Sequence, residues 1–119
     1  AYKEVFQTYV DNGCLKIPVI QEGVVINNHA YFVILDNSVN QEMFLSLLKE
    51  KDIYAYIGYM PLHSSPMGRR FSYQADDLPI TEVLASRIVR LPFYTELQGD
   101  SLHYCIEGMH AVLQTIYDL

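Results

Sequence analysis

The longest uninterrupted apolar segment of the chain is Ala30–Leu35. It has the length of a β-strand and falls well short of the ~20 residues that span a bilayer. The sequence therefore predicts a strand from His29 to Asp36. Because Tyr31–Leu35 is apolar at every position, we expect this strand to lie at the centre of a sheet, with both faces covered.

Helices are predicted on both sides of this strand. Before it, apolar residues at helical spacing predict a helix over Tyr2–Val10, which Asn12-Gly13 ends. After it, a helix is predicted over Asn40–Lys51, with Asn40 as the N-cap. The expected inward stripe of this second helix is Met43, Phe44, Leu47 and Leu48.

The remaining segments of the first two thirds are shorter or irregular. Lys16–Gln21 contains a proline and is expected to be an extended connector, and Gly23–Ile26 a short strand. Ile53–Ile57 alternates in the manner of a strand. Gly58–Gln74 is a long irregular stretch with prolines and glycines, and loops of this length are often functional.

The last third predicts two more helices around a short extended segment. Asp76-Asp77 and Pro79 open the first of them, and Arg90–Tyr94 follows as the extended segment. Asp100-Ser101 is expected to cap the last helix. The apolar stripes of the two helices are Ile80, Val83, Leu84 and Ile88, and then Leu102, Cys105, Ile106, Met109, Leu113 and Ile116.

This order of elements is typical of a small open sheet with helices packed on it, an α/β (α+β) domain. A length of 119 residues suits a single domain, residues 1–119. The chain begins with Ala1 and enters a helix at once, so we expect it to be a fragment of a longer polypeptide.

Composition excludes several classes of protein. Hydrophobic residues make up 50% and charged residues 18%, which argues against disorder. The net charge of -6 gives no support to binding of nucleic acid or of an anionic membrane. Two cysteines outside any CxxC pair do not form a disulfide framework. We expect Cys14 and Cys105 to be reduced, buried thiols of a cytoplasmic protein without a signal peptide.

The histidines are the first candidates for chemistry. His103 and His110 are expected on the solvated polar face of the last helix, without enough partners for a metal site. His29 lies at the end of the central strand, where ligand sites are common. His63 lies in the long loop, where functional residues concentrate.

Other candidates are weaker. The glycines fit no phosphate-binding spacing, and Ser64 and Ser65 are interpreted as turn hydroxyls before Pro66. No lysine is expected to be buried, so none is predicted to form a catalytic imine. Arg69-Arg70 could hold an anion but is more typical of a solvated surface. Tyr54, Tyr56 and Tyr59 would suit a sugar, a nucleotide or a protein interface.

A family resemblance joins these segments. It rests on the ordered set Lys16–Ile20, Asn28–Ile34, Leu47–Lys51, Tyr59–His63 and Ala85–Tyr94, which covers nearly the whole chain. The set resembles the C-terminal small domain of pyridoxal phosphate (PLP)-dependent sugar-nucleotide aminotransferases of the DegT/StrS type. Within this family the chain is most similar to the transaminases of dTDP-4-keto-6-deoxyglucose. Those enzymes make dTDP-4-amino-4,6-dideoxygalactose for bacterial lipopolysaccharide and other surface polysaccharides.

The resemblance implies a small, mainly antiparallel sheet packed with helices, as in the small domain of fold-type I PLP transferases. It places PLP and its lysine in a preceding large domain, outside this chain. The isolated chain is then expected to be inactive and to bind no cofactor. The full-length enzyme would be a homodimer that takes its amino group from a donor such as glutamate and passes it to a dTDP-sugar.

The resemblance also implies site residues. Carried over by position, Tyr59 and His63 would face the substrate cleft, with Asn28 and His29 near it. No catalytic or metal-binding residue is assigned to the chain. Gly58 is a departure, because many family members have His before the loop tyrosine. It is expected either to leave room for a ligand or to permit an unusual backbone angle.

Two other functions remain open from the sequence. The first is a stand-alone small α/β module for binding or regulation, suggested by the chain's size and its tyrosine-rich loop. The second is a small hydrolase that would use His63 with Ser64 or Ser65, although neighbouring residues of one loop seldom provide both base and nucleophile.

Overall fold

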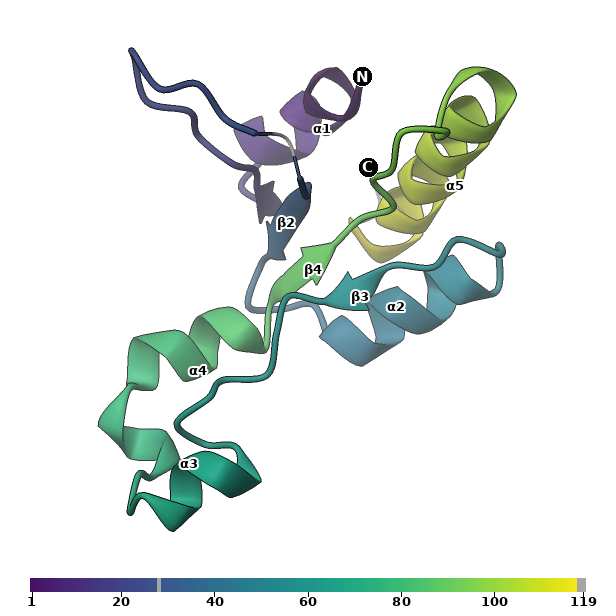
Figure 1. Cartoon of the computed structure of the whole chain (residues 1–119). Helices are drawn as coiled ribbons and strands as arrows, with labels where there is room; N and C mark the ends of the chain where they lie inside the picture. The colour runs from purple at the N-terminus through teal and green to yellow at the C-terminus, as the bar shows by residue number, and fades with distance from the viewer. Residues whose placement is uncertain (28, 118–119) are drawn as a thin grey trace.

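A four-stranded antiparallel sheet of order β1-β2-β4-β3 organises the chain (Figure 1). The computed structural model describes residues 1–27 and 29–117. The strands are β1 (Leu15–Lys16), β2 (Phe32–Leu35), β3 (Tyr56–Ile57) and β4 (Ile88–Arg90). The helices are α1 (Tyr2–Asp11), α2 (Gln41–Lys49), α3 (Pro66–Arg70), α4 (Pro79–Ala85) and α5 (Gly99–Tyr117), with a 3₁₀ turn at Ala75–Asp77. The predicted small α/β fold with a mainly antiparallel sheet is confirmed.

The pairing of β2 with β4 forms the centre of the sheet. Its register joins Phe32 to Arg90, Val33 to Val89 and Ile34 to Ile88. Val33, Leu35 and Val89 are buried, whereas Phe32 and Ile34 are only half-buried. The prediction that β2 is covered on both faces is therefore wrong. Side chains alternate along a strand, and the helices of the core cover only one of its two faces.

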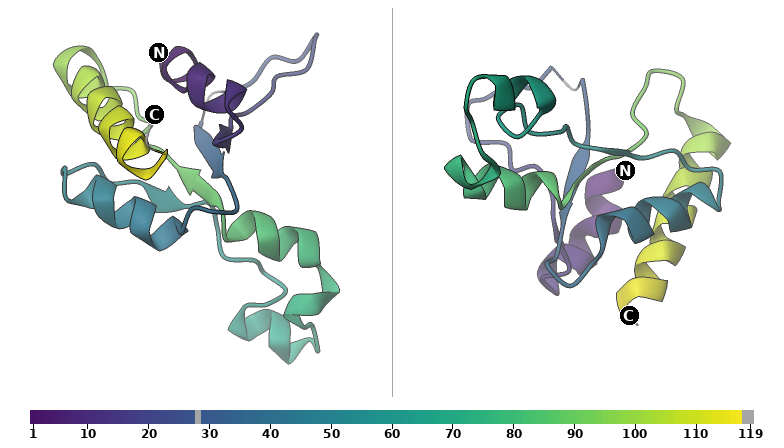
Figure 2. Two further views of the ribbon diagram at one scale, coloured as in Figure 1. Left: turned by 180° about the vertical axis from the view of Figure 1, so that it is seen from behind. Right: turned by 90° about the horizontal axis from the view of Figure 1, so that it is seen from below.

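The hydrophobic core lies between the covered face of the sheet and three helices. Figure 2 shows α1, α2 and α5 gathered on one side of the strands. The helices contribute Tyr2, Phe6 and Tyr9 from α1, Phe44 and Leu48 from α2, and Met109, Val112 and Leu113 from α5. Each fully buried side chain of this kind stabilises the fold by about 1.5–3 kcal/mol. The predicted stripes of these helices are therefore core residues, apart from the exposed Met43.

The ends of the helices follow local signals in the sequence. Gly13 adopts a φ of 73° just after α1, as the predicted stop requires. The Asn40 side chain accepts a hydrogen bond of 2.8 Å from the backbone N–H of Met43, so Asn40 is the N-cap of α2. The last helix begins one residue before its predicted cap, at Gly99.

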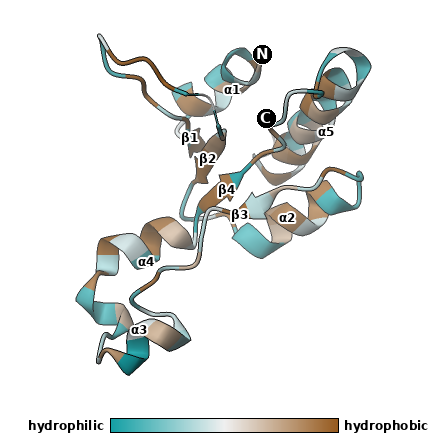
Figure 3. Ribbon diagram, in the orientation of Figure 1, coloured by the Kyte–Doolittle hydropathy of each residue, from teal (hydrophilic) through white to brown (hydrophobic). Residues whose placement is uncertain are grey.

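Three predicted extended segments differ from the structure. Gly23–Ile26 forms no strand and lies in the loop between β1 and β2, which extends away from the sheet and includes apolar residues (Figure 3). Val25 in this loop is 97% exposed. The connector after α1 contains the short strand β1, which pairs with the end of β2. The strand predicted over Ile53–Ile57 contracts to β3, because Asp52 turns with a φ of 54° and Ile53 is buried in the core.

The segment between β3 and β4 projects away from the sheet (Figures 1 and 2). We call residues 62–85 the α3–α4 arm. The sequence missed α3, although Ser65 caps it and Pro66 occupies its first turn. The predicted inward stripe of α4 is exposed, with Ile80 76% exposed, and Ile88 belongs to β4. The radius of gyration is 15.7 Å, against roughly 13 Å for a compact chain of about 100 residues.

Tyrosine hydroxyls fix the two terminal helices to the rest of the fold. Tyr2 of α1 donates a hydrogen bond of 2.8 Å to the carbonyl oxygen of Pro92. Tyr117 of α5 donates to the carbonyl oxygen of Cys14. Burial raises the pKa of Tyr117 to about 12. None of the described helices is long and apolar enough to cross a membrane.

The raised pKa of Tyr117 predicts a loss of stability in alkali. The folded state favours the neutral phenol, so this contribution is fully present below the ordinary pKa of 10.0 and is lost as pH rises towards about 12. We expect Tyr117→Phe to flatten the fall in unfolding free energy across this range, measured by urea denaturation at several pH values. Tyr56→Phe, at an exposed tyrosine, is the control. Equal slopes for Tyr117→Phe and wild type would contradict this assignment.

Candidate functional site

A groove of about 460 Å³ opens on the uncovered side of the sheet, where β2, β4 and α4 meet the segment after β3. We call it the central groove. It is lined by His29, Ala30, Phe32, Gly58, Tyr59, Met60, Pro61, Thr81, Leu84, Ala85, Ile88 and Arg90. Most of these side chains are apolar, and His29, Tyr59, Thr81 and Arg90 supply the polar groups. A mainly apolar cleft with a few polar groups is the usual form of a small-molecule site.

Arg90 and Tyr59 form the main polar contact of the central groove. Nη1 of Arg90 donates a hydrogen bond of 2.9 Å to the hydroxyl of Tyr59. The guanidinium carbon also lies 5.1 Å from the centroid of the Tyr59 ring, a cation–π distance. The sequence analysis missed Arg90 as a site residue. The sequence feature that could have pointed to Arg90 is a charged residue in a short apolar strand, two residues after Ile88.

Of the residues carried over from the family resemblance, two lie at the central groove. Tyr59 is 75% exposed, and His29 is exposed, with Nδ1 2.7 Å from Oδ1 of Asn27. Asn28 lies outside the described residues. The structure thus brings Tyr59 and His29 together at one groove, and their contact with a substrate stays a prediction.

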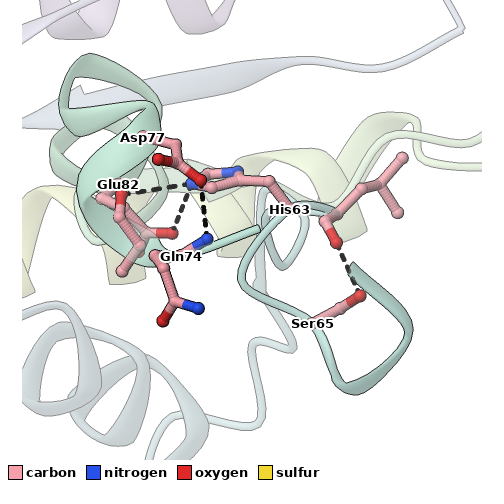
Figure 4. A network of polar contacts seen from close by, with 7 residues as sticks. His63, Ser65, Gln74, Asp77 and Glu82 are labelled. Carbon is pink, nitrogen blue, oxygen red and sulfur yellow. Dashed lines mark hydrogen bonds and ion pairs between the residues drawn. The ribbon is translucent and has the colours of Figure 1, made fainter. Parts of the chain in front are cut away.

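His63 lies apart from these residues, at the wall of a second groove on the α3–α4 arm. Figure 4 shows its polar contacts. It is only 7% exposed. Its Nε2 atom lies 3.1 Å from Oε1 of Glu82 and 3.4 Å from the carbonyl oxygen of Ala75. Oε1 of Glu82 is buried, and apart from this contact with Nε2 of His63 it has no polar partner among the described residues. His63 therefore joins the loop after β3 to α4, and its predicted contact with substrate stays untested.

The neighbouring serine also has a structural role. Oγ of Ser65 donates a hydrogen bond of 2.6 Å to the carbonyl oxygen of Leu62 (Figure 4). It also accepts one of 3.1 Å from the N–H of Gly68. It caps α3, in agreement with its interpretation as a turn hydroxyl. Because the ring of His63 faces Glu82 and Ala75, the geometry gives no support to a hydrolase built on this loop.

Gly58 packs against Ile88. Its N–H donates a hydrogen bond of 3.1 Å to the carbonyl oxygen of Ile88. A Cβ atom at position 58 would overlap Cγ2 of Ile88 and lie 3.2 Å from its Cβ. The φ of Gly58 is not positive, so the expectation of an unusual backbone angle is wrong. The missing side chain makes room for Ile88, and because Gly58 also lines the central groove, the expectation that it leaves room for a ligand stays a prediction.

The other candidates lie elsewhere. All four lysines are exposed, as predicted, and so are Arg69 and Arg70.

The two histidines of α5 differ in their surroundings. His103 is exposed, but His110 is not on a solvated face, because its Nδ1 lies 3.0 Å from the hydroxyl of Tyr9. Cys14 and Cys105 are free and half-buried, and burial raises the pKa of the Cys105 thiol. Within residues 1–27 and 29–117, no three His, Cys, Asp or Glu side chains cluster as a metal site requires.

Comparison with known sequences gives consistent matches. The profile of the DegT/DnrJ/EryC1/StrS aminotransferase family matches residues 1–110. A dTDP-3-amino-3,4,6-trideoxy-alpha-D-glucose transaminase of Micromonospora megalomicea is 28% identical over 93% of this chain and 31% of its own length. An uncharacterised protein of Methanocaldococcus jannaschii is 28% identical over 83% of this chain and 26% of its own. The chain thus spans between a quarter and a third of these relatives.

Solved structures share the fold. Spr1654 of Streptococcus pneumoniae, which is assigned as a sugar aminotransferase, matches in its PLP form with a TM-score of 0.78 and 18% identity. The match covers 96% of this chain and 31% of that one. The aminotransferase TlmJ of Streptoalloteichus hindustanus matches with a TM-score of 0.77 and 22% identity, over 95% of this chain and 30% of that one.

The pairing of His63 with Glu82 predicts coupled effects on the α3–α4 arm. His63→Phe leaves the buried Glu82 oxygen unpaired, and Glu82→Met removes the partner of the ring. We expect each change to lower the free energy of local opening of the α3–α4 arm by about 1 kcal/mol. The double variant is expected to lower it by less than the sum of the two single changes. Hydrogen exchange of the α3 and α4 amides measures this effect. Exposed Glu107→Met is the control, and additive effects would contradict the pairing.

The contact of Gly58 with Ile88 predicts a second coupling. Gly58→Ala introduces a Cβ into an occupied position, and we expect it to lower the unfolding free energy by about 1–3 kcal/mol. Ile88→Ala removes the atoms in its way, so the double variant is expected to lose less than the two single changes together. Chemical denaturation of the four proteins measures the cycle. An unfolding free energy of Gly58→Ala equal to that of wild type would contradict a steric conflict between a Cβ at position 58 and the side chain of Ile88.

Proposed function

Because the chain belongs to the DegT/DnrJ/EryC1/StrS aminotransferase family, we propose that it is the C-terminal small domain of a PLP-dependent aminotransferase acting on a keto sugar nucleotide. The similarity to a dTDP-amino-sugar transaminase supports this class of substrate. The share of the relatives that the chain spans supports its assignment as one domain of a longer enzyme.

The central groove is the observation that carries the proposal. It exposes a tyrosine face, an imidazole and a guanidinium above an apolar floor. A tyrosine ring offers an apolar face and a hydroxyl, which suits stacking on a sugar or base together with a hydrogen bond. We propose that Tyr59 and His29 form one wall of the substrate cleft, and the family resemblance adds Asn28 to this proposal. His63 would act from behind this wall by holding the loop to α4.

The described residues do not fit PLP itself. A Schiff base needs a desolvated lysine, whereas Lys3, Lys16, Lys49 and Lys51 are exposed and none lines the central groove. In this proposal the cofactor and its lysine belong to a large domain that precedes the small one in the longer polypeptide. The PLP form of the similar Streptococcus pneumoniae structure supports a PLP enzyme.

We further propose dTDP-4-keto-6-deoxyglucose as the substrate, glutamate as the amino donor and a cytoplasmic homodimer as the active form. The product would be dTDP-4-amino-4,6-dideoxygalactose, a precursor of lipopolysaccharide or another surface polysaccharide. The Micromonospora megalomicea relative supports the dTDP group, but its name places the amine at C3. The position of amination is therefore the part of this proposal that an assay must decide.

A stand-alone binding module is the less favoured function. Large exposed apolar side chains occur along residues 19–26, 56–62 and 67–84. Those at Leu62, Met67, Phe71, Tyr73 and Leu78 line one groove on the α3–α4 arm. Large apolar patches on a surface usually mark places that another part covers. The exposed surface thus supports a domain that packs within a larger enzyme.

The proposal predicts transamination by the longer polypeptide and none by the 119-residue chain. The polypeptide in its pyridoxamine phosphate form is mixed with dTDP-4-keto-6-deoxyglucose, and conversion of the cofactor to the pyridoxal form is followed by absorbance. We expect conversion, with regeneration by glutamate. NMR of the product then assigns the aminated carbon and its stereochemistry.

Two controls make this assay decisive. The 119-residue chain with added pyridoxamine phosphate is expected to produce no amino sugar, because its lysines are exposed and none lines the groove. The 3-keto isomer of the substrate tests the alternative position of amination. Turnover by the isolated chain, or failure of the longer polypeptide with both keto sugars, would refute the proposal.

A further inference from the structure

Arg90 occupies the boundary between two grooves. It lines the central groove, and it also lines a neighbouring groove of about 510 Å³ that runs towards α5 and includes Asp52, Tyr54, Tyr56 and Cys105. Across the sheet it pairs with Phe32 on one side and Tyr56 on the other. The guanidinium is thus fixed in the middle of the uncovered face, with a cavity on either side.

The charge of Arg90 has no carboxylate partner among the described residues. Asp52 lines the neighbouring groove, but no oxygen of Asp52 lies within ion-pair distance of the guanidinium. The hydroxyl of Tyr59 is the only described side chain that accepts from it. A guanidinium has five N–H donors, so most of its capacity remains available in a chain whose net charge is -6.

The geometry also restrains the guanidinium. Contact with the face of the Tyr59 ring limits its rotation, and the hydrogen bond from Nη1 fixes one arm of the fork. A restrained planar fork matches the paired oxygens of phosphate or carboxylate and loses little entropy when it binds them. Half-burial among apolar and tyrosine side chains strengthens such a charge-assisted contact.

We propose that Arg90, held by Tyr59, is an oxyanion-binding residue at the junction of the two grooves. It takes a phosphate or carboxylate group of a ligand that lies along the uncovered face. This inference rests on the proposed function for the identity of the ligand. The diphosphate of the sugar nucleotide and the carboxylate of the amino donor share the required chemistry, and the experiment separates them.

The test compares Arg90→Met, Arg90→Lys and the control Arg69→Met, an exposed arginine of α3, in the longer polypeptide. Equilibrium dialysis measures binding of dTDP and of thymidine without any turnover. Steady-state kinetics measures KM for the keto sugar nucleotide and for glutamate. We expect Arg90→Met to weaken binding of one anionic ligand by about 10- to 100-fold, the loss typical of a charge-assisted hydrogen bond. Arg90→Lys, which keeps the charge without the fork, should lose less.

The outcomes distinguish the sources. Loss of dTDP binding with unchanged thymidine binding assigns Arg90 to the diphosphate, and a raised KM for glutamate alone assigns it to the carboxylate. Equal losses for dTDP and thymidine would show that Arg90 only shapes the groove and would overturn the inference. Wild-type behaviour of Arg90→Met would also overturn it. The circular dichroism spectrum of Arg90→Met shows whether this variant has a folding defect. Partial recovery of ligand binding in Arg90→Lys would show that the loss in Arg90→Met comes from the missing charge and not from misfolding.

The equilibrium dialysis measurement tests this inference separately from the proposed function. If the polypeptide binds dTDP through Arg90 but aminates no keto sugar, the oxyanion site stands and the aminotransferase assignment fails. If transamination proceeds and none of the ligands responds to Arg90→Met, the assignment stands and the oxyanion site fails.

Discussion

The antiparallel ladder between β2 and β4 is the interaction on which the rest of the structure depends. Three residue pairs hold it, and α1, α2 and α5 close the face that carries Val33, Leu35 and Val89. Because side chains alternate along a strand, the same ladder turns Phe32 and Arg90 to the opposite face. One ladder therefore builds the core and supplies the floor of the central groove, since α1, α2 and α5 cover only its first face.

The α3–α4 arm depends on a different kind of interaction. Its helices have five and seven residues, and helices of this length are marginal in water without tertiary support. The arm buries little apolar surface and is held by polar contacts, which are the Ser65 cap, the reciprocal bonds of Gln74 with Asp77, and His63 beside Glu82. The loop that carries Tyr59 leads into this arm. Its position at the groove is therefore set by polar contacts as well as by the sheet.

The sequence predicted the elements that bury an apolar stripe and failed where burial depends on distant partners. The three core helices follow from periodic stripes such as Phe44 and Leu48, whose burial satisfies the pattern locally. The stripe of α4 has the same period, yet Ile80 faces solvent because no described element packs on it. Arg90 was missed for a related reason. Its contact with Tyr59 exists only because β3 and β4 pair across an excursion of some 30 residues.

Gly58 and Arg90 lie close together at the central groove and differ in what they supply to it. Gly58 supplies no side chain, and the space beside it is filled by Ile88. Arg90 follows two residues later on the same face of β4 and places its guanidinium against Tyr59. The charge of an imidazole changes near neutral pH, whereas a guanidinium stays protonated in proteins. If Arg90 binds an oxyanion as proposed, the positive charge that it supplies would therefore stay constant near neutral pH.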